Sequence, residues 1–297
     1  MENFNALVKR AMQIGGRDRM RPVVEKELFH YDILFALDES GLLDRLTFQG
    51  GTCLRLCYGA PRFSEDLDFL GGAGFDASSM ATLKGCLEDY LGRRYGLEIS
   101  VKEPKEVAGE PEYRDIKVDT WRISIRTAPE AKDLPSQRLK IEIANLDALS
   151  RVPRSVVANY DFLPDGYGDT IVLAETLDEI MADKVVSLVN CRAYVRHRDI
   201  WDLHWLIKQG AKLNGGFVAQ KVRQYQVGDY PKLADDFRQR LPEIVHGRAF
   251  KEQMMRFLPV DVLDRTLHKE KFNDLLVNEV GDLLVRAVGC VEKQVEG

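Results

Sequence analysis

Three acidic residues, Glu65, Asp66 and Asp68, lie within four consecutive positions near the end of the segment FQGGTCLRLCYGAPRFSEDLDFL, residues 48–70. Carboxylates placed this close repel one another unless a positive charge meets them. Side chains two residues apart in a β-strand point to the same face of the sheet. If residues 66–70 form a strand, Asp66 and Asp68 therefore share one face, and we expect a cation beside them.

The cation that best suits such a pair is Mg²⁺, with Mn²⁺ as the alternative. Mg²⁺ prefers oxygen ligands and is commonly held by one or two carboxylates together with substrate phosphates. Two such ions can stabilise the attacking and leaving oxygens of a nucleotidyl transfer. Glu142 alternates with isoleucines in the run KIEI, residues 140–143, which is typical of a half-buried strand. Glu142 is therefore a candidate third metal ligand beside Asp66 and Asp68.

Two adjacent glycines, Gly50 and Gly51, precede a short run with helical character. Backbone N–H groups at a strand-to-helix turn, together with the positive end of the helix dipole, can bind a triphosphate. Thr52 follows and could add its hydroxyl. Each feature alone has a simpler explanation: a Gly-Gly pair is usually a turn, and both an Asp-x-Asp and Glu142 are usually solvated. The order of strand, Gly-Gly-Thr, short helix and Asp-x-Asp on the next strand favours a nucleotidyltransferase core.

A helix with one central lysine is predicted in the C-terminal half. Thr176 opens this helix with Glu179 three residues on, which is a capping-box pattern. Lys184 then lies among apolar residues of the same helix. It is either an ion-pair residue with a buried stem or a compact positive charge for a triphosphate.

Three arginines, Arg192, Arg196 and Arg198, form the densest basic cluster in a chain whose net charge is −5. One interpretation is a solvated connection whose arginines pair with nearby acids. The other is a contact to the phosphate backbone of RNA. Asp199 and Asp202 follow and begin a helix, where acidic side chains favour the positive end of the dipole. Helix capping therefore explains one of these two aspartates.

The composition is that of a globular protein with a core, since 45% of the 297 residues are hydrophobic and 30% are charged. The negative net charge excludes a global basic field, so a nucleic acid partner would need a local patch. The N-terminus is too polar for a signal peptide, and no apolar stretch approaches the length of about 18 residues that spans a membrane. The five cysteines are scattered and odd in number, which indicates reduced thiols and a cytoplasmic location.

Hydrophobic periodicity predicts an α+β (mixed α/β) fold with a strand-rich first part and a mainly α-helical C-terminal domain. Residues 1–160 are expected to form the nucleotidyltransferase domain with N-terminal helices. Residues 161–297 are expected to form the helical domain that supplies Lys184 and Asp199. The expected helices are 3–14, 22–39, 52–58, 80–95, 176–190, 199–208 and four or more over 216–293, and the expected strands are 46–48, 66–70, 97–101, 121–125 and 139–144.

The first segment resembles the polymerase-β-like nucleotidyltransferase superfamily, whose mark is a Gly-Gly or Gly-Ser turn followed by Asp-x-Asp. More narrowly, FQGGTCLRLCYGAPRFSEDLDF is similar to the first motif block of the AbiEii/AbiGii-type nucleotidyltransferase toxins, which include the MenT group. In that family a helix supplies a lysine, and an Arg-Asp-x-x-Asp-Leu segment follows, as in LDEIMADKVVSLVNCRAYVRHRDIWDLHWL, residues 177–206. Within the first block, Arg62 and Ser64 could touch phosphates.

The resemblance implies a toxin of a toxin–antitoxin or phage-defence system, with a cognate antitoxin protein. It implies transfer of a nucleotide from a nucleoside triphosphate (NTP), with Mg²⁺, to RNA, and foremost to the 3′ end of tRNA. By position it implies that Asp66 and Asp68 bind the metal, that Lys184 contacts the nucleotide and that Asp199 assists catalysis. A nucleotidyltransferase that modifies a protein or a small molecule is the alternative. A binding module without catalysis is disfavoured because Asp66, Asp68 and Lys184 are all present.

Overall fold

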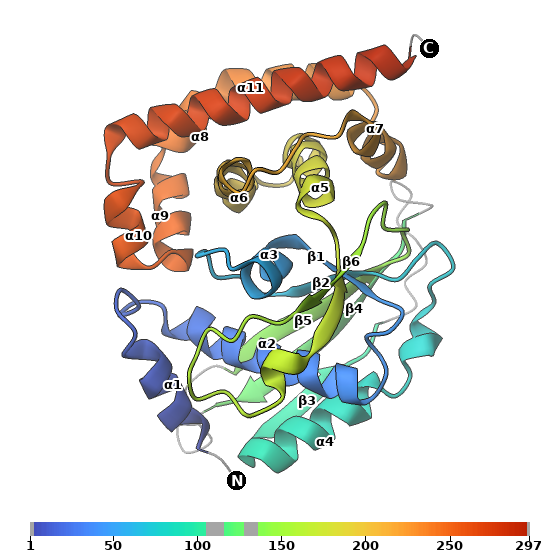
Figure 1. Ribbon diagram of the computed structural model, residues 1–297, viewed down its shortest axis with the longest axis vertical. Coiled ribbons are helices and arrows are strands. Elements are labelled where there is room, and N and C mark those ends of the chain that lie inside the picture. Colours follow the sequence, from blue (N-terminus) through green and yellow to red (C-terminus); the bar gives the residue numbers. More distant parts are fainter. Residues whose placement is uncertain (1–2, 105–115, 128–135, 296–297) are drawn as a thin grey trace. The chain divides into compact units, whose positions relative to one another are not determined.

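The computed structural model describes residues 3–104, 116–127 and 136–295. The chain divides into two compact units, Met1–Glu175 and Thr176–Gly297. Figure 1 colours the first from blue to yellow-green and the second from yellow to red. The division lies after Glu175 and not at residue 160, where the sequence placed it. The physical reason is that two further strands, on either side of the loop at 163–169, belong to the sheet of the first unit.

The described part of the first unit contains a seven-stranded sheet in the order β3-β4-β5-β2-β1-β7-β6. The strands are β1 (Thr47–Gln49), β2 (Leu67–Leu70), β3 (Glu98–Lys102), β4 (Val118–Arg126), β5 (Gln137–Ala144), β6 (Val152–Ser155) and β7 (Ile171–Ala174). β2 pairs antiparallel with β1 and parallel with β5. β7 pairs parallel with β1, which is why this short apolar run, not expected from the sequence, belongs to the first unit.

Helices surround this sheet. They are α1 (Phe4–Met12), α2 (Arg21–Glu39), α3 (Gly50–Tyr58) and α4 (Leu83–Tyr95), with short 3-10 helices at Ala77–Met80 and Tyr167–Asp169. Three of the helices meet at an aromatic cluster, in which Phe4 stacks on Phe29 at 4.2 Å between ring centroids and Tyr95 meets the Phe4 ring edge-on at 5.2 Å. Where the sequence predicted one helix over 80–95, the structure has the 3-10 helix Ala77–Met80 followed by α4.

The second unit is helical over all of its described elements. These are α5 (Leu177–Asn190), α6 (His197–Lys208), α7 (Gly215–Gln224), α8 (Tyr230–His246), α9 (Arg248–Phe257), α10 (Val260–Arg265) and α11 (Glu270–Val295). The Thr176 side chain accepts from the Glu179 N–H, so the predicted cap of α5 is present. The long helix α11 lies along α8 (Figure 1). Within the described ranges, no helix combines the length and apolar character needed to cross a membrane.

Candidate active site

The acidic pair lies where β2 begins, and the orientation of Asp68 follows the predicted alternation. Leu67 and Phe69 are buried, and Phe69 stacks on Phe48 of β1 with ring centroids 4.9 Å apart. Asp66 and Asp68 are both half-buried. The strand begins at Leu67 and not at residue 66, and the alternation sets Asp68 on the face opposite Leu67 and Phe69.

Gly50 allows the acidic strand to approach the turn between β1 and α3. Its φ of +75° lies in the left-handed region that favours glycine. A β-carbon at this position would lie only 2.9 Å from Asp68 Oδ2. The carboxylate of Asp68 therefore sits directly against the turn, in space that any other residue would fill.

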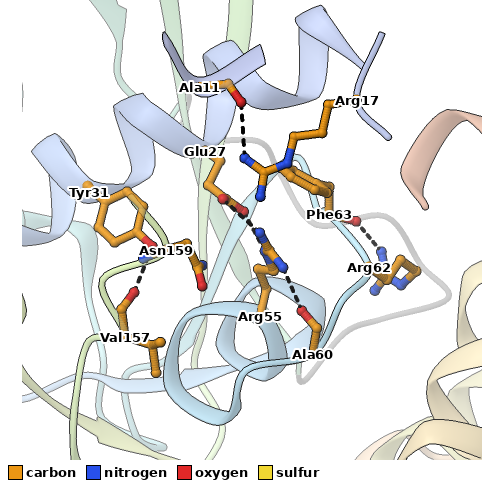
Figure 2. Close-up of polar contacts among 10 residues, drawn as sticks. All are labelled: Ala11, Arg17, Glu27, Tyr31, Arg55, Ala60, Arg62, Phe63, Val157 and Asn159. Carbon is orange, nitrogen blue, oxygen red and sulfur yellow. Dashed lines mark hydrogen bonds and ion pairs between the residues drawn. The ribbon is translucent and has the colours of Figure 1, made fainter. Parts of the chain in front are cut away.

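Gly51 allows a similar close approach of Arg62 and Ser64, the two residues predicted to contact phosphates. A β-carbon there would lie 2.4 Å from Arg62 Nη2 and 3.0 Å from Ser64 Oγ. The buried guanidinium of Arg62 also donates from Nη1 to the Phe63 carbonyl at 2.7 Å, as Figure 2 shows. The structure thus brings Gly50, Gly51, Arg62 and Ser64 together around one turn.

Thr52 differs from the expectation. Only 1% of the residue is exposed, and its hydroxyl donates to the carbonyl oxygen of Asp66. The hydroxyl therefore holds the start of β2 against α3 and does not face a nucleotide. A small hydroxyl residue directly after the two glycines fits this buried bond as well as it fits a phosphate contact, so the sequence alone did not separate the two roles.

The predicted metal trio is only partly assembled. The parallel register of β2 and β5 sets Asp68 beside Glu142. However, Glu142 Oε1 lies 3.5 Å from Lys140 Nζ, because residues two apart on β5 share a face. Across the part of the chain that the structure describes, no group of three or more His, Cys, Asp or Glu side chains is arranged to hold a metal ion. The described residues therefore do not bring Asp66, Asp68 and Glu142 together into one metal site, and their role as metal ligands stays a prediction.

The remaining oxygen donors fit a divalent cation. Burial raises the pKa of Asp66, while Lys140 and Lys26 oppose this increase and Glu142 adds to it. The carboxylate is thus in a position where a further positive charge would be favourable. Two carboxylates with phosphate oxygens are a donor set that Mg²⁺ or Mn²⁺ accepts. Asp66 and Asp68 are the residues that would hold such an ion.

In the second unit, Lys184 lies at the centre of a buried cluster. Its Nζ is 2.6 Å from Asp199 Oδ1 and 2.9 Å from Asp202 Oδ2, and the three side chains are 5%, 6% and 2% exposed. The other Asp199 oxygen, Oδ2, meets Arg196 Nε. The ion-pair interpretation of Lys184 is therefore correct for this conformation, and both aspartates have a partner beyond helix capping.

The charges of this cluster set the protonation state of Asp199. Burial would raise the pKa of Asp199, but the neighbouring Arg196 and Lys184 outweigh it and hold that pKa well below its usual value. The carboxylate therefore remains ionised near neutral pH, with both oxygens engaged. Asp199 can orient Lys184 in this arrangement, whereas it is poorly suited to accept a proton.

The predicted basic cluster does not form one uniform patch. Arg196 is committed to Asp199, and the Arg198 guanidinium lies over the Phe257 ring at 4.8 Å from its centroid. Arg192 is exposed. Sequence spacing placed the three arginines close together but did not show that one of them belongs to the Lys184 cluster. The i,i+3 spacing of Arg196 and Asp199 was the available signal.

Comparison with known proteins identifies the family. The model of the family described as "Nucleotidyl transferase AbiEii toxin, Type IV TA system" matches residues 32–278. The chain belongs to this family. It is accordingly a nucleotidyltransferase and a toxin of a type IV toxin–antitoxin system, which confirms the family and the enzyme class predicted from the two motif blocks.

Two solved structures are similar to this chain, and the first of them supports the fold. MenT4, a nucleotidyltransferase toxin from Mycobacterium tuberculosis H37Rv, is 18% identical and superposes with a TM-score of 0.57 over 97% of this chain and 94% of its own. JHP933 from Helicobacter pylori is also 18% identical, with a TM-score of 0.47 over 92% of this chain and 95% of its own. No curated protein matches the chain in sequence. The likeness to MenT4 confirms the mixed α+β fold predicted from the sequence.

Proposed function

We propose that this toxin transfers a nucleotide from an NTP to RNA, with the 3′ end of tRNA as the foremost acceptor. The observation that carries the proposal is the convergence at the β1–α3 turn. There, the two glycines leave room for the carboxylate of Asp68 on one side and the guanidinium of Arg62 on the other. An oxygen donor for a cation and a cationic group for a phosphate thus meet at a helix N-terminus.

The reaction assigns a role to each part of this turn. The acceptor hydroxyl oxygen forms a bond to the α-phosphorus, the bond between the α- and β-phosphates breaks, pyrophosphate leaves and the hydroxyl proton passes to water. Gly50 and Gly51 bind the triphosphate through backbone N–H groups, and Arg62 and Ser64 orient it. Mg²⁺ or Mn²⁺, held by Asp66 and Asp68, would neutralise charge on the phosphates when bound.

Lys184 is proposed to add a compact positive charge for the triphosphate. Since its Nζ contacts two carboxylates, a phosphate oxygen would have to add to these contacts or replace one of them. Asp199 and Arg196 keep the lysine oriented and charged. In this proposal Asp199 assists catalysis through Lys184 and does not take the proton of the acceptor.

RNA is favoured as the acceptor by the family resemblance and by the exposed Arg192, which lies four residues before Arg196 in the chain. A single strand contacting this side chain would release counterions from its phosphates. We further propose that a cognate antitoxin restrains the activity in a cytoplasmic, phage-defence setting.

The test incubates the protein with each of four α-³²P-labelled ribonucleoside triphosphates, Mg²⁺ or Mn²⁺, and either total RNA or deacylated tRNA. We expect label on RNA with at least one triphosphate and none with Asp68→Asn. Label on the protein itself or on a small molecule, with RNA unlabelled in every combination, would show that the acceptor assignment is wrong. No label on any acceptor would count against the NTP assignment.

A further inference from the structure

The segment between α3 and β2, residues 59–66, contains three of the proposed site residues, Arg62, Ser64 and Asp66. It forms neither helix nor strand. Its geometry therefore depends on contacts from its neighbours, and side chains of α2 supply them at both ends. These α2 residues, Lys26, Glu27 and His30, all precede residue 32, where the family match begins.

One end of the segment is held through Arg55 of α3. Glu27 of α2 accepts two bonds from its guanidinium, Nε to Oε2 at 2.7 Å and Nη2 to Oε1 at 3.0 Å, and both side chains are buried. Figure 2 shows that Arg55 also donates from Nη1 to the Ala60 carbonyl, at 3.0 Å. The same guanidinium lies 4.2 Å from the centroid of the buried Phe63 ring. Glu27 thus fixes Arg55, and Arg55 fixes the residues on both sides of Arg62.

The other end is held by two further residues of α2. Lys26 Nζ lies 2.8 Å from Glu65 Oε1, and both side chains are largely buried. His30 Nε2 donates to the Glu65 carbonyl at 3.0 Å. The cation that meets Glu65 is therefore Lys26, and this explains why a third acid can stand beside Asp66 and Asp68.

We propose that α2 is the positioning element of the nucleotide site, with Lys26 and Glu27 as its principal positioning residues. A buried ion pair is weak evidence for stability, and its best-attested use is to select one arrangement of the chain. Here the Glu27–Arg55 and Lys26–Glu65 pairs fix the two ends of a segment that has no backbone ladder of its own. Arg62 and Ser64 are thereby held against Gly51. The consequence for nucleotide binding rests on the proposed function, whereas the positioning itself does not.

The test uses charge removal and charge exchange at the more accessible pair. The variants are Lys26→Met, Glu65→Gln and the exchange Lys26→Glu with Glu65→Lys. Arg21→Met is the control, because it removes an ion pair of similar length from the same helix but away from the segment: 2.7 Å for Arg21–Glu25 against 2.8 Å for Lys26–Glu65. Hydrogen–deuterium exchange of residues 59–66 reports positioning, and affinity for each of the four ribonucleoside triphosphates with Mg²⁺ reports its consequence.

For Lys26→Met we expect about tenfold faster amide exchange over 59–66 and about tenfold weaker triphosphate binding, with the rest of the first unit unchanged. The exchanged pair should recover most of the amide protection over 59–66 and most of the triphosphate affinity. Arg21→Met should change neither of these two quantities. Glu27→Gln should have the same effects on exchange and on binding, and near-ultraviolet circular dichroism is used to check that this variant is folded. Unchanged exchange of 59–66 in both Lys26→Met and Glu65→Gln would overturn the inference. If the wild-type protein binds none of the triphosphates, the proposed function fails while the exchange data still decide whether α2 positions the segment.

Discussion

Replacing Lys184 by methionine should cost the second unit stability as well as activity. The substitution keeps the apolar stem but removes the charge that lies within 3 Å of two carboxylates. Breaking a buried ion pair by removing one partner costs about 3–5 kcal/mol, because the remaining charge stays buried. Asp199 retains Arg196 as a partner, so we take the lower end of this range. We expect the free energy of unfolding of Lys184→Met to fall by about 3 kcal/mol.

The sequence offers a way to measure this for the second unit alone. The protein has three tryptophans, of which Trp121 lies in β4 and Trp201 and Trp205 lie in α6. In a Trp121→Phe background, tryptophan fluorescence during urea unfolding reports the second unit. The free energy of unfolding, extrapolated linearly to zero urea, is then compared between the Trp121→Phe protein and the same protein that also carries Lys184→Met.

Lys184→Arg separates stability from chemistry. Arginine keeps the charge and can bond both carboxylates, so the free energy of unfolding should change by less than about 1 kcal/mol. Its planar fork does not replace a compact ammonium on a triphosphate, so transfer should recover poorly. An unchanged urea transition in Lys184→Met would refute the energetic argument for the cluster. Wild-type transfer by Lys184→Arg would refute the proposed point-charge role.

Four further results are expected. Asp66→Ala and Asp68→Ala should each abolish transfer. The stability of the metal-free protein should stay level or rise in both variants, because a repelling carboxylate is removed. Only the wild-type protein should gain thermal stability on addition of Mg²⁺. Gly50→Ala should lower transfer at least tenfold in the labelled-nucleotide assay, because φ is +75° and the new methyl group displaces the Asp68 carboxylate. Asp199 has a lowered pKa when folded, so its stabilisation is fully present above about pH 4 and is lost as the pH falls; Asp199→Asn should be less stable at pH 7 and show a shallower loss in urea unfolding below pH 4. Arg192→Ala should weaken RNA binding and make the slope of log affinity against log salt less steep by about 0.7, with triphosphate affinity unchanged.

The sequence by itself determined the local chemistry of this protein. The period of two in β2 placed Asp68 on the face opposite Leu67 and Phe69, which are buried. The cap at Thr176 fixed the start of α5 because its side chain bonds the backbone N–H of Glu179, three residues on. These features depend on neighbours in the chain, and the two motif blocks are of the same kind, so the family could be read from them.

The tertiary structure decided which charges meet. Lys26 and Glu65 are 39 residues apart, and no spacing rule links a helix residue to a loop that far away. The register of β2 with β5 sets Asp68 beside Glu142, but the side chain of Glu142 forms an ion pair with Lys140.

The same reason explains the two largest differences from the sequence-based expectations. The boundary between the units moved to residue 175 because β7 pairs with β1, a contact between strands that are distant in the chain. Arg196, grouped by sequence with an RNA-binding cluster, is bound to Asp199 and supports Lys184 instead. A side chain's charge is fixed by its type, but its role depends on which opposite charge the fold brings within reach and whether water is excluded from the pair.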